Sequence, residues 1–214
     1  MSRIAVIGGH GKVALHLSRI LSGRGHQVSS LIRNPDHRAD VEATGAEAVV
    51  ADVESLDAGR LAEVLRGHDA VVWSAGAGGG SPERTYAVDR DAAVMSMDAA
   101  AQAGIRRYVM VSYFGAAPDH GVPADNPFFA YAEAKAAADE HLRATDLDWT
   151  VLGPSGLTDE ESTGRIDTGA SASSQVSRED VALVVAEALE QPATVHRTVR
   201  FNNGETPIGD ALTR

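Results

Sequence analysis

Short apolar runs alternate along this chain with stretches in which apolar residues recur every three or four positions. Such runs are typical of strands buried on both faces, and such spacing is typical of helices that pack against a sheet. The runs predict strands at residues 4–7, 27–32, 46–51, 70–74, 107–112, 149–152 and 198–202. The periodic stretches predict helices at residues 12–22, 56–65, 82–103, 127–144 and 176–191.

This alternation predicts an α/β fold, a doubly wound parallel sheet of the Rossmann type. Helix-length connections between strands imply right-handed crossovers and parallel neighbours. With 214 residues the chain is long enough for one substantial core, so residues 1–214 are expected to form a single domain. Residues from about 153 to 214 are expected to form a small segment on its substrate side. Residues 158–177, rich in Ser, Thr, Gly and Asp, are predicted to form a mobile flap.

Composition and charge argue against several classes of function. A net charge of −11 repels phosphate backbones and disfavours nucleic acid as a partner. The chain has no cysteine, which rules out thiol catalysis, and its dispersed histidines predict no metal site. No apolar run reaches membrane-spanning length, and the first strand leaves no room for a signal peptide. We therefore expect a cytoplasmic protein that acts on a small molecule and not on a membrane.

The most informative motif lies where the first predicted strand gives way to a helix. It reads, in order, Gly8, Gly9, His10, Gly11, Lys12 and Val13. Gly8 can adopt the turn, Gly11 lets a diphosphate approach the main chain, and N–H groups of the first helical turn face the phosphates. Tight turns also use glycine for geometry alone, but the position of this one predicts a dinucleotide site. Val13 excludes a Walker A loop, which needs a hydroxyl there.

The loop after the second predicted strand carries Arg33 and Asn34, with His37 and Arg38 close behind. Enzymes restricted to NAD usually place a carboxylate here. A guanidinium instead suits a 2′-phosphate by its charge and by its forked donors. The loop therefore favours NADP as the cofactor, with NAD as the alternative. A solvated basic loop without a ligand would show the same pattern.

The next two strand ends carry residues suited to other parts of a dinucleotide. Asp52 could accept from the adenine amino group while Val53 packs on the ring, although an aspartate here also serves as a turn or helix cap. Ala75, Gly76 and Ala77 follow the fourth predicted strand, where small residues permit a close approach of the cofactor ribose. A flexible connection without a ligand is the alternative for this glycine-rich stretch.

Candidate catalytic residues come later in the chain. Ser112 ends the fifth predicted strand, and Tyr131 and Lys135 lie four positions apart on one helix face. A nearby ammonium lowers the pKa of a phenol, so Tyr131 is predicted to exchange a proton with a carbonyl or alcohol. Ser112 could bind the same oxygen, and both Ser112 and Lys135 are also predicted cofactor contacts. A half-buried tyrosine beside a solvated lysine is the alternative.

A turn after the sixth predicted strand completes the candidate site. Its residues are Pro154, Ser155, Gly156 and Leu157. The proline and the glycine fix a turn whose backbone could meet the nicotinamide amide. An ordinary strand-terminating turn is the alternative.

Taken in order, these motifs resemble the atypical single-domain, NAD(P)H-binding members of the short-chain dehydrogenase/reductase superfamily. The resemblance rests on residues 8–11, 33–35, 52–53, 105–112, 131–135, 155–158, 176–182 and 204–208. It is similar to the biliverdin or flavin reductases and to the nitrogen-metabolite-repression redox sensors. Ala14 replaces the third glycine of the turn, Gly153 stands where an arginine is frequent, and Tyr113 replaces a small residue. The last two changes bear on the substrate pocket.

The resemblance implies an NADP(H)-dependent oxidoreductase that acts on a small carbonyl, quinone or flavin-like acceptor. In that reading Lys135 binds the nicotinamide ribose and Tyr131 donates the proton. A redox sensor that binds the cofactor and signals through a partner protein is the alternative. An isomerase or dehydratase of the sugar-nucleotide type is a third, disfavoured because the chain lacks a large C-terminal substrate domain. In many relatives, helices like those from Pro82 and Pro127 pair across a two-fold axis, which implies a homodimer as one option.

Overall fold

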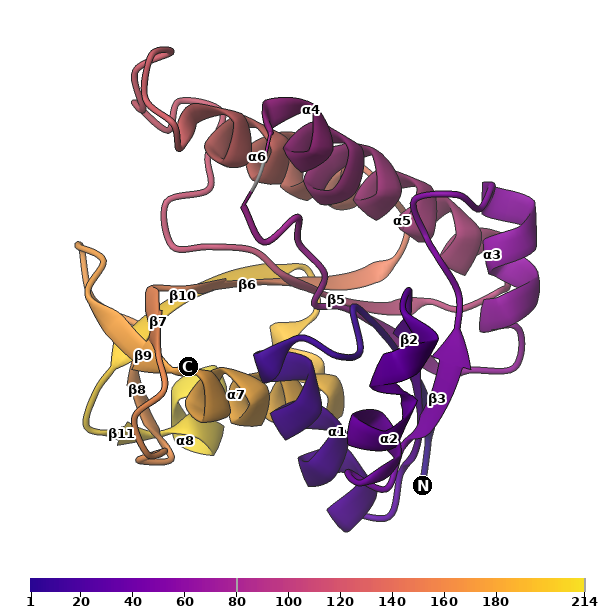
Figure 1. Cartoon of the computed structure of the whole chain (residues 1–214). Coiled ribbons are helices and arrows are strands. Elements are labelled where there is room, and N and C mark those ends of the chain that lie inside the picture. The colour runs from indigo at the N-terminus through magenta and orange to yellow at the C-terminus, as the bar shows by residue number, and fades with distance from the viewer. Residues whose placement is uncertain (80, 214) are drawn as a thin grey trace.

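The computed structural model describes residues 1–79 and 81–213. A large twisted sheet forms the middle layer, and helices cover both of its faces (Figure 1). Gly80, in the glycine-rich loop expected at residues 76–82, and Arg214 lie outside the described residues. No helix within these residues combines the length and apolar composition needed to cross a membrane.

Nine strands of the described residues form the main sheet, in the order β11-β8-β10-β6-β5-β4-β1-β2-β3. Its parallel strands are β1 (Arg3–Ile7), β2 (Gln27–Ile32), β3 (Glu47–Val50), β4 (Ala70–Trp73), β5 (Arg107–Val111), β6 (Asp148–Pro154) and β10 (Arg197–Asn203). Its antiparallel edge consists of β8 (Arg165–Asp167) and β11 (Thr206–Pro207). A separate parallel pair joins β7 (Gly156–Thr158) to β9 (Gln175–Ser177).

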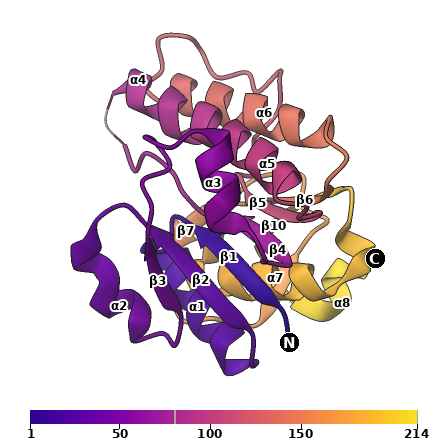
Figure 2. The ribbon, with the colours of Figure 1, turned by 90° about the vertical axis from the view of Figure 1, so that its right-hand side faces the viewer.

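The helices divide between the two faces of the sheet (Figure 2). One face is covered by α1 (Lys12–Gly23), α2 (Arg38–Glu42), α7 (Arg178–Glu190) and α8 (Ile208–Leu212). The other face is covered by α3 (Ala58–Leu65), α5 (Ala93–Gln102) and α6 (Phe129–Arg143). Shorter helical segments are η1 (Pro35–His37), α4 (Pro82–Thr85), η2 (Tyr86–Ala92) and η3 (Pro192–Thr194).

Alternation along the strands explains why both faces are covered. In β1, Ile4 and Val6 pack into the core beneath α1 and α7, whereas Ala5 and Ile7 pack into the core beneath α3 and α5. A strand that is apolar on both sides must be buried on both sides. The predicted doubly wound fold is confirmed, and its strand order reverses between β1 and β4, where such folds hold their ligands.

The purely parallel sheet expected from the sequence is wrong at one edge. There β8 pairs antiparallel with β10 and with β11, so residues 153–214 both extend the main sheet and close its edge. These strands are only two or three residues long, which is too short for a pattern to show.

Residues 158–177, predicted to form a mobile flap, contribute to the three strands β7, β8 and β9, and their mobility stays a prediction. A fully buried carboxylate, Asp180, organises this stretch from the first turn of α7. Asp180 accepts hydrogen bonds from Ser162 Oγ at 2.6 Å, from the Gly164 N–H at 2.8 Å and from Ser177 Oγ at 2.9 Å. Polar side chains that suggested mobility are the ones that fix the turn.

Two predicted helices differ from the observed ones in ways that matter for the site. The helix expected at residues 82–103 contains the π-helical segment η2, and its widened turn places both Val88 and Asp89 in the interior. The helix expected from residue 176 begins at Arg178, because Ser177 caps it by accepting from the Asp180 N–H at 3.0 Å.

Candidate functional site

The glycine turn after β1 is shaped by close packing on two sides. Gly8 has φ +84°, and a Cβ there would lie 2.6 Å from the Ala75 main chain. A Cβ on Gly9 would lie 2.6 Å from the Cβ of Ser30. Gly11 is different, because its nearest protein atom would be the Gly8 carbonyl oxygen at 3.3 Å. Gly8 and Gly9 are therefore required by the fold, whereas Gly11 leaves its side of the turn open.

The N-terminus of α1 opens directly from this turn. Gly11 is the N-cap residue in an extended conformation, and no side chain of the described residues caps the helix there. The first turn of α1 also contains no acidic residue. Its N–H groups and the positive end of the helix dipole remain available to an anion, which is the arrangement that binds a diphosphate.

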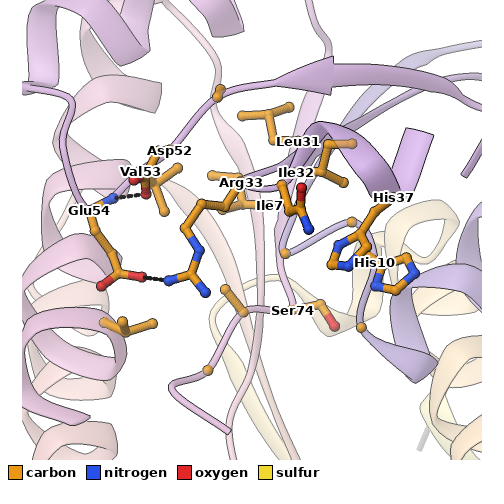
Figure 3. Close-up of a pocket in the computed structure, with 18 of the residues that line it drawn as sticks. Ile7, His10, Leu31, Ile32, Arg33, His37, Asp52, Val53, Glu54 and Ser74 are labelled. Carbon is orange, nitrogen blue, oxygen red and sulfur yellow. Dashed lines mark hydrogen bonds and ion pairs between the residues drawn. The ribbon is translucent and has the colours of Figure 1, made fainter. Parts of the chain in front are cut away.

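A cavity of about 310 Å³ lies at the strand-order reversal, and we call it the switch-point cavity (Figure 3). Its walls include most of the residues predicted to hold the nucleotide. These are Gly8, Gly9, His10, Gly11, Arg33, Asn34, Asp52, Val53, Ala75 and Gly76. The structure thus brings together strand ends that are far apart in the sequence, as the fold rule for parallel sheets requires.

Three charged side chains share one end of the switch-point cavity. Arg33 Nη1 lies 2.7 Å from Glu54 Oε1, and Arg84 Nη2 lies 3.3 Å from the same oxygen. Figure 3 shows the guanidinium of Arg33 directed toward Glu54. Asp52 accepts a hydrogen bond from the Glu54 N–H at 3.1 Å, so it also serves as the turn residue that the sequence left as an alternative.

Two imidazole rings lie on the other side of Arg33. His10 from the glycine turn stacks on His37, with ring centroids 3.6 Å apart and 13° between the planes. His10 Nε2 also lies 2.9 Å from Asp40 Oδ2. The rings bring polar nitrogens to the wall of the cavity nearest to α1.

A second cavity of about 290 Å³ lies between the loop after β4 and the start of α6, and we call it the aromatic cavity. It is lined by Ala77, Gly78, Gly79, Thr85, Asp89, Pro127, Phe128 and Tyr131. Phe128 and Tyr131 pack with ring centroids 5.1 Å apart, and Tyr113 packs against both at 5.4 Å. Gly76 lines the first cavity and Ala77, the next residue, lines the second, so both cavities border this loop.

Behind the aromatic cavity lies a buried polar cluster formed by Asp89, Ser112, Lys135 and Asp139, all 1–5% exposed. Lys135 Nζ donates to the Val111 carbonyl at 2.9 Å and lies 4.0 Å from Asp89 Oδ1. Ser112 Oγ donates to Asp139 Oδ2 at 2.7 Å. The hydroxyl predicted to bind a substrate oxygen therefore has a buried carboxyl as its acceptor.

Burial changes the proton affinity of this whole region. It raises the pKa of Asp89 and of Asp139, against the opposing charge of Lys135, and it lowers the pKa of Lys135. It also raises the pKa of Tyr131, an effect that Asp89, Tyr113 and Asp139 reinforce. This direction is opposite to the lowered phenol pKa expected from the Tyr131–Lys135 spacing, because desolvation and the nearby carboxyls act on the phenol.

The remaining predicted residues line neither cavity, and their contacts with a cofactor stay predictions. Lys12 is exposed and pairs with Asp159 at 2.7 Å, while Val13 packs into the core. Pro154 ends β6, and Ser155 Oγ donates to Asn202. Gly156 and Leu157 begin β7, with Leu157 39% exposed.

Sequence reasoning missed several polar residues of these cavities. Glu54 and Arg84 line the switch-point cavity, and Asp89 and Asp139 belong to the buried polar cluster. Asp139 carried a signal, since it lies on the same helix face as Tyr131 and Lys135, eight positions after the tyrosine. Asp89 points inward because it lies in the π-helical turn of η2. No pattern of residues in the sequence predicted that turn.

The fold, the glycine turn and the uncapped helix define a dinucleotide-binding protein of the Rossmann class. The chain matches the family model described as NAD(P)H-binding over residues 8–192, and it belongs to that family. It is 33% identical to YhfK of Bacillus subtilis, an uncharacterized sugar epimerase, with 98% of each chain covered.

Solved structures extend the likeness over the whole fold. A Bacillus halodurans protein assigned as an NAD-dependent epimerase/dehydratase superposes with a TM-score of 0.91, at 32% identity and with 99% of each chain covered. The oxidoreductase ylbE from Lactococcus lactis superposes with a TM-score of 0.88, at 30% identity over 98% of this chain and 94% of that chain. The predicted resemblance to atypical short-chain dehydrogenases/reductases is confirmed.

Proposed function

We propose that the protein is an NADP(H)-dependent oxidoreductase that reduces a small carbonyl, quinone or flavin-like acceptor. The observation that carries this proposal is that two cavities border the same loop, one at Gly76 and the other at Ala77. One cavity has the polar strand ends and glycine turn suited to a nucleotide, and the other has an apolar, aromatic wall suited to a small acceptor. Hydride transfer requires such neighbouring sites.

The residues of the switch-point cavity fit a dinucleotide. The open side of Gly11 admits a diphosphate beside the uncapped N-terminus of α1. Asp52 and Val53 offer an acceptor and an apolar contact for the adenine. Bound NADPH would supply the hydride, and Lys135, four residues from the aromatic cavity along α6, would hold the nicotinamide ribose.

The preference for NADP rests on the positive groups at the end of β2. Arg33 forms an ion pair with Glu54, but the side chain of Arg33 is 56% exposed. It can therefore turn toward a 2′-phosphate without leaving a buried group unpaired. His10 and His37 offer further donors on the same wall. Binding of NAD with equal affinity would contradict this choice.

A redox sensor is the second candidate, and the state of Tyr131 favours it. The pKa of this phenol is raised, so Tyr131 is a weaker acid than the sequence suggested. A sensor would bind the cofactor without turning it over.

Two measurements separate the candidates. Calorimetry with NADPH, NADP and NAD tests the cofactor and its phosphate preference. Oxidation of NADPH, followed by absorbance with a panel of aldehydes, quinones and flavins, tests the reaction. Tight binding with steady turnover supports the oxidoreductase, tight binding without turnover across the panel supports the sensor, and a lack of binding refutes both.

A further inference from the structure

Asp89 lines the aromatic cavity beside the loop that both cavities border. Its carboxyl is 1% exposed. Oδ2 accepts the Ala77 N–H at 3.0 Å, while Oδ1 has no hydrogen-bond partner among the described residues. A Cβ on Gly76 would lie 3.2 Å from that Oδ1. The carboxyl therefore reaches from the acceptor side to the loop that borders the nucleotide side.

A buried carboxyl oxygen without a partner calls for an explanation, because a desolvated polar atom left unpaired destabilises the fold. Its nearest ionic neighbour, Lys135 Nζ, is 4.0 Å away and already donates to the Val111 carbonyl. A carboxyl that donates its own proton to a ligand in the cavity would satisfy the unpaired oxygen. The position of Asp89 therefore suits a substrate whose oxygen can accept this hydrogen bond in the aromatic cavity.

The groups around Asp89 shift its pKa in opposite directions. Burial raises its pKa, while Lys135 on α6, the Ala77 N–H and Arg84 on α4 act in the opposite direction. Tyr131 and Asp139, also on α6, and Tyr113, which packs against Tyr131, are further titratable groups of this region. A carboxyl whose pKa is raised from 3.8 moves toward the range in which general acids work best.

Tyr131 lines the same cavity but is a poorer acid. The pKa of its phenol is raised above an ordinary value of 10.0, and the ammonium meant to lower it is bonded to the Val111 carbonyl. The ring packs against Phe128 and Tyr113, which suits it to hold a flat acceptor in place.

We infer that Asp89, rather than Tyr131, donates the proton to the acceptor oxygen, and that the aromatic cavity takes an uncharged, planar carbonyl compound. This inference rests on the proposed function. Bound NADPH would supply a hydride to the carbonyl carbon, and the C=O π pair would move to the carbonyl oxygen. That oxygen takes the proton as the O–H bond of Asp89 breaks, which gives an alcohol and a carboxylate.

Groups around Asp89 can stabilise the negative charge that its carboxylate carries after the proton has left. The Ala77 N–H donates to one oxygen of Asp89, and the ammonium of Lys135 faces the other. Water entering the aromatic cavity after release of the alcohol would return the proton. Tyr131 acts as a positioning residue for the acceptor in this scheme.

The first experiment observes the proton on Asp89 itself. Protein labelled with ¹³C at the aspartate side-chain carbons is titrated by NMR with NADP bound, and Asp89→Asn assigns the signal. We expect the pKa of Asp89 to lie well above 3.8, the ordinary value for an aspartate side chain. A pKa of Asp89 at or below 3.8 would overturn the inference.

The second experiment measures turnover of NADPH with benzaldehyde and with 9,10-phenanthrenequinone. Asp89→Asn keeps an acceptor for the Ala77 N–H and removes only the acidic proton, so NADPH affinity should stay within about threefold while kcat falls about 10²–10⁴-fold. Tyr131→Phe should lower kcat by less than about tenfold. Asp91→Asn, an exposed carboxylate on the same segment η2, should leave kcat unchanged.

The outcomes separate the two proposals. Wild-type turnover in Asp89→Asn, or a larger loss in Tyr131→Phe than in Asp89→Asn, would overturn the role of Asp89 and leave the proposed oxidoreductase intact. Wild-type protein that binds NADPH but oxidises none with either probe would overturn the carbonyl-reduction scheme as a whole.

Discussion

The switch-point cavity and the buried polar cluster use charge in opposite ways. In the cavity, Arg33 and Arg84 share Glu54 at a surface where the side chains are 27–56% exposed. Such pairs contribute only about 0–1 kcal/mol, so they exchange partners easily when a ligand arrives. In the cluster, Asp89, Lys135 and Asp139 are at most 2% exposed, and burial shifts the pKa of all three. The first arrangement suits recognition of a charged ligand, and the second suits control of a proton.

The glycine turn offers the strongest test of the recognition region. Gly11→Val should weaken NADPH binding by well over tenfold, or about 1.4 kcal/mol and more, because a branched side chain would occupy the open side of the turn. The fold should survive. Gly8→Val is the contrasting variant, since its Cβ would lie 2.6 Å from the Ala75 main chain at a positive φ, and it should unfold at markedly lower temperature. Calorimetry with thermal unfolding checks both. Unchanged affinity in a folded Gly11→Val would remove the nucleotide from this turn.

Arg33→Glu tests the charge at the open end of the same cavity. The new carboxylate would face Glu54 and repel a 2′-phosphate, so NADP affinity should fall at least tenfold relative to NAD. Calorimetry with both cofactors gives the ratio. If the affinities for NADP and NAD fall by the same factor, Arg33 stabilises the loop and does not bind the 2′-phosphate.

Glu54→Gln should produce a smaller change of opposite sign. Removing the carboxylate leaves Arg33 and Arg84 without their shared partner and raises the positive potential of the cavity. NADP affinity should rise about two- to threefold at low salt, and the gain should shrink as salt is added. Glu42→Gln, at an exposed pair outside the cavity, is the matched control. Weaker binding in Glu54→Gln would show that Glu54 itself contacts the cofactor.

The buried polar cluster makes a different prediction, on stability. A carboxyl whose pKa is raised by folding favours the folded state most when it is protonated, below its unfolded value near 3.8. That advantage is lost as pH rises through the folded pKa. Asp89→Asn should therefore gain stability relative to wild type between about pH 4 and pH 7. Urea unfolding at several pH values measures the difference, and a constant difference would mean that Asp89 has an ordinary proton affinity.

The two regions also differ in how far the sequence revealed them. Gly8, Gly9, Gly11, Arg33 and Asp52 all line one cavity because parallel strands end at the same edge, so their positions followed once the strands were recognised. Glu54 was missed because it follows Asp52 in an irregular turn. Lys135 and Tyr131 were found by their spacing, but the direction of the tyrosine pKa was wrong, since spacing carries no information about burial.

By itself, the sequence determined the alternation of strands and helices and the glycine turn. These features depend on the spacing of apolar residues and on the conformational freedom of glycine, and both can be recognised from residues close together in the sequence. Only the tertiary structure decided that Asp180 orders residues 158–177 and that Asp89 turns inward beneath Ala77. Those outcomes depend on which charged groups lose water when distant segments pack together, and desolvation is a property of the assembled core.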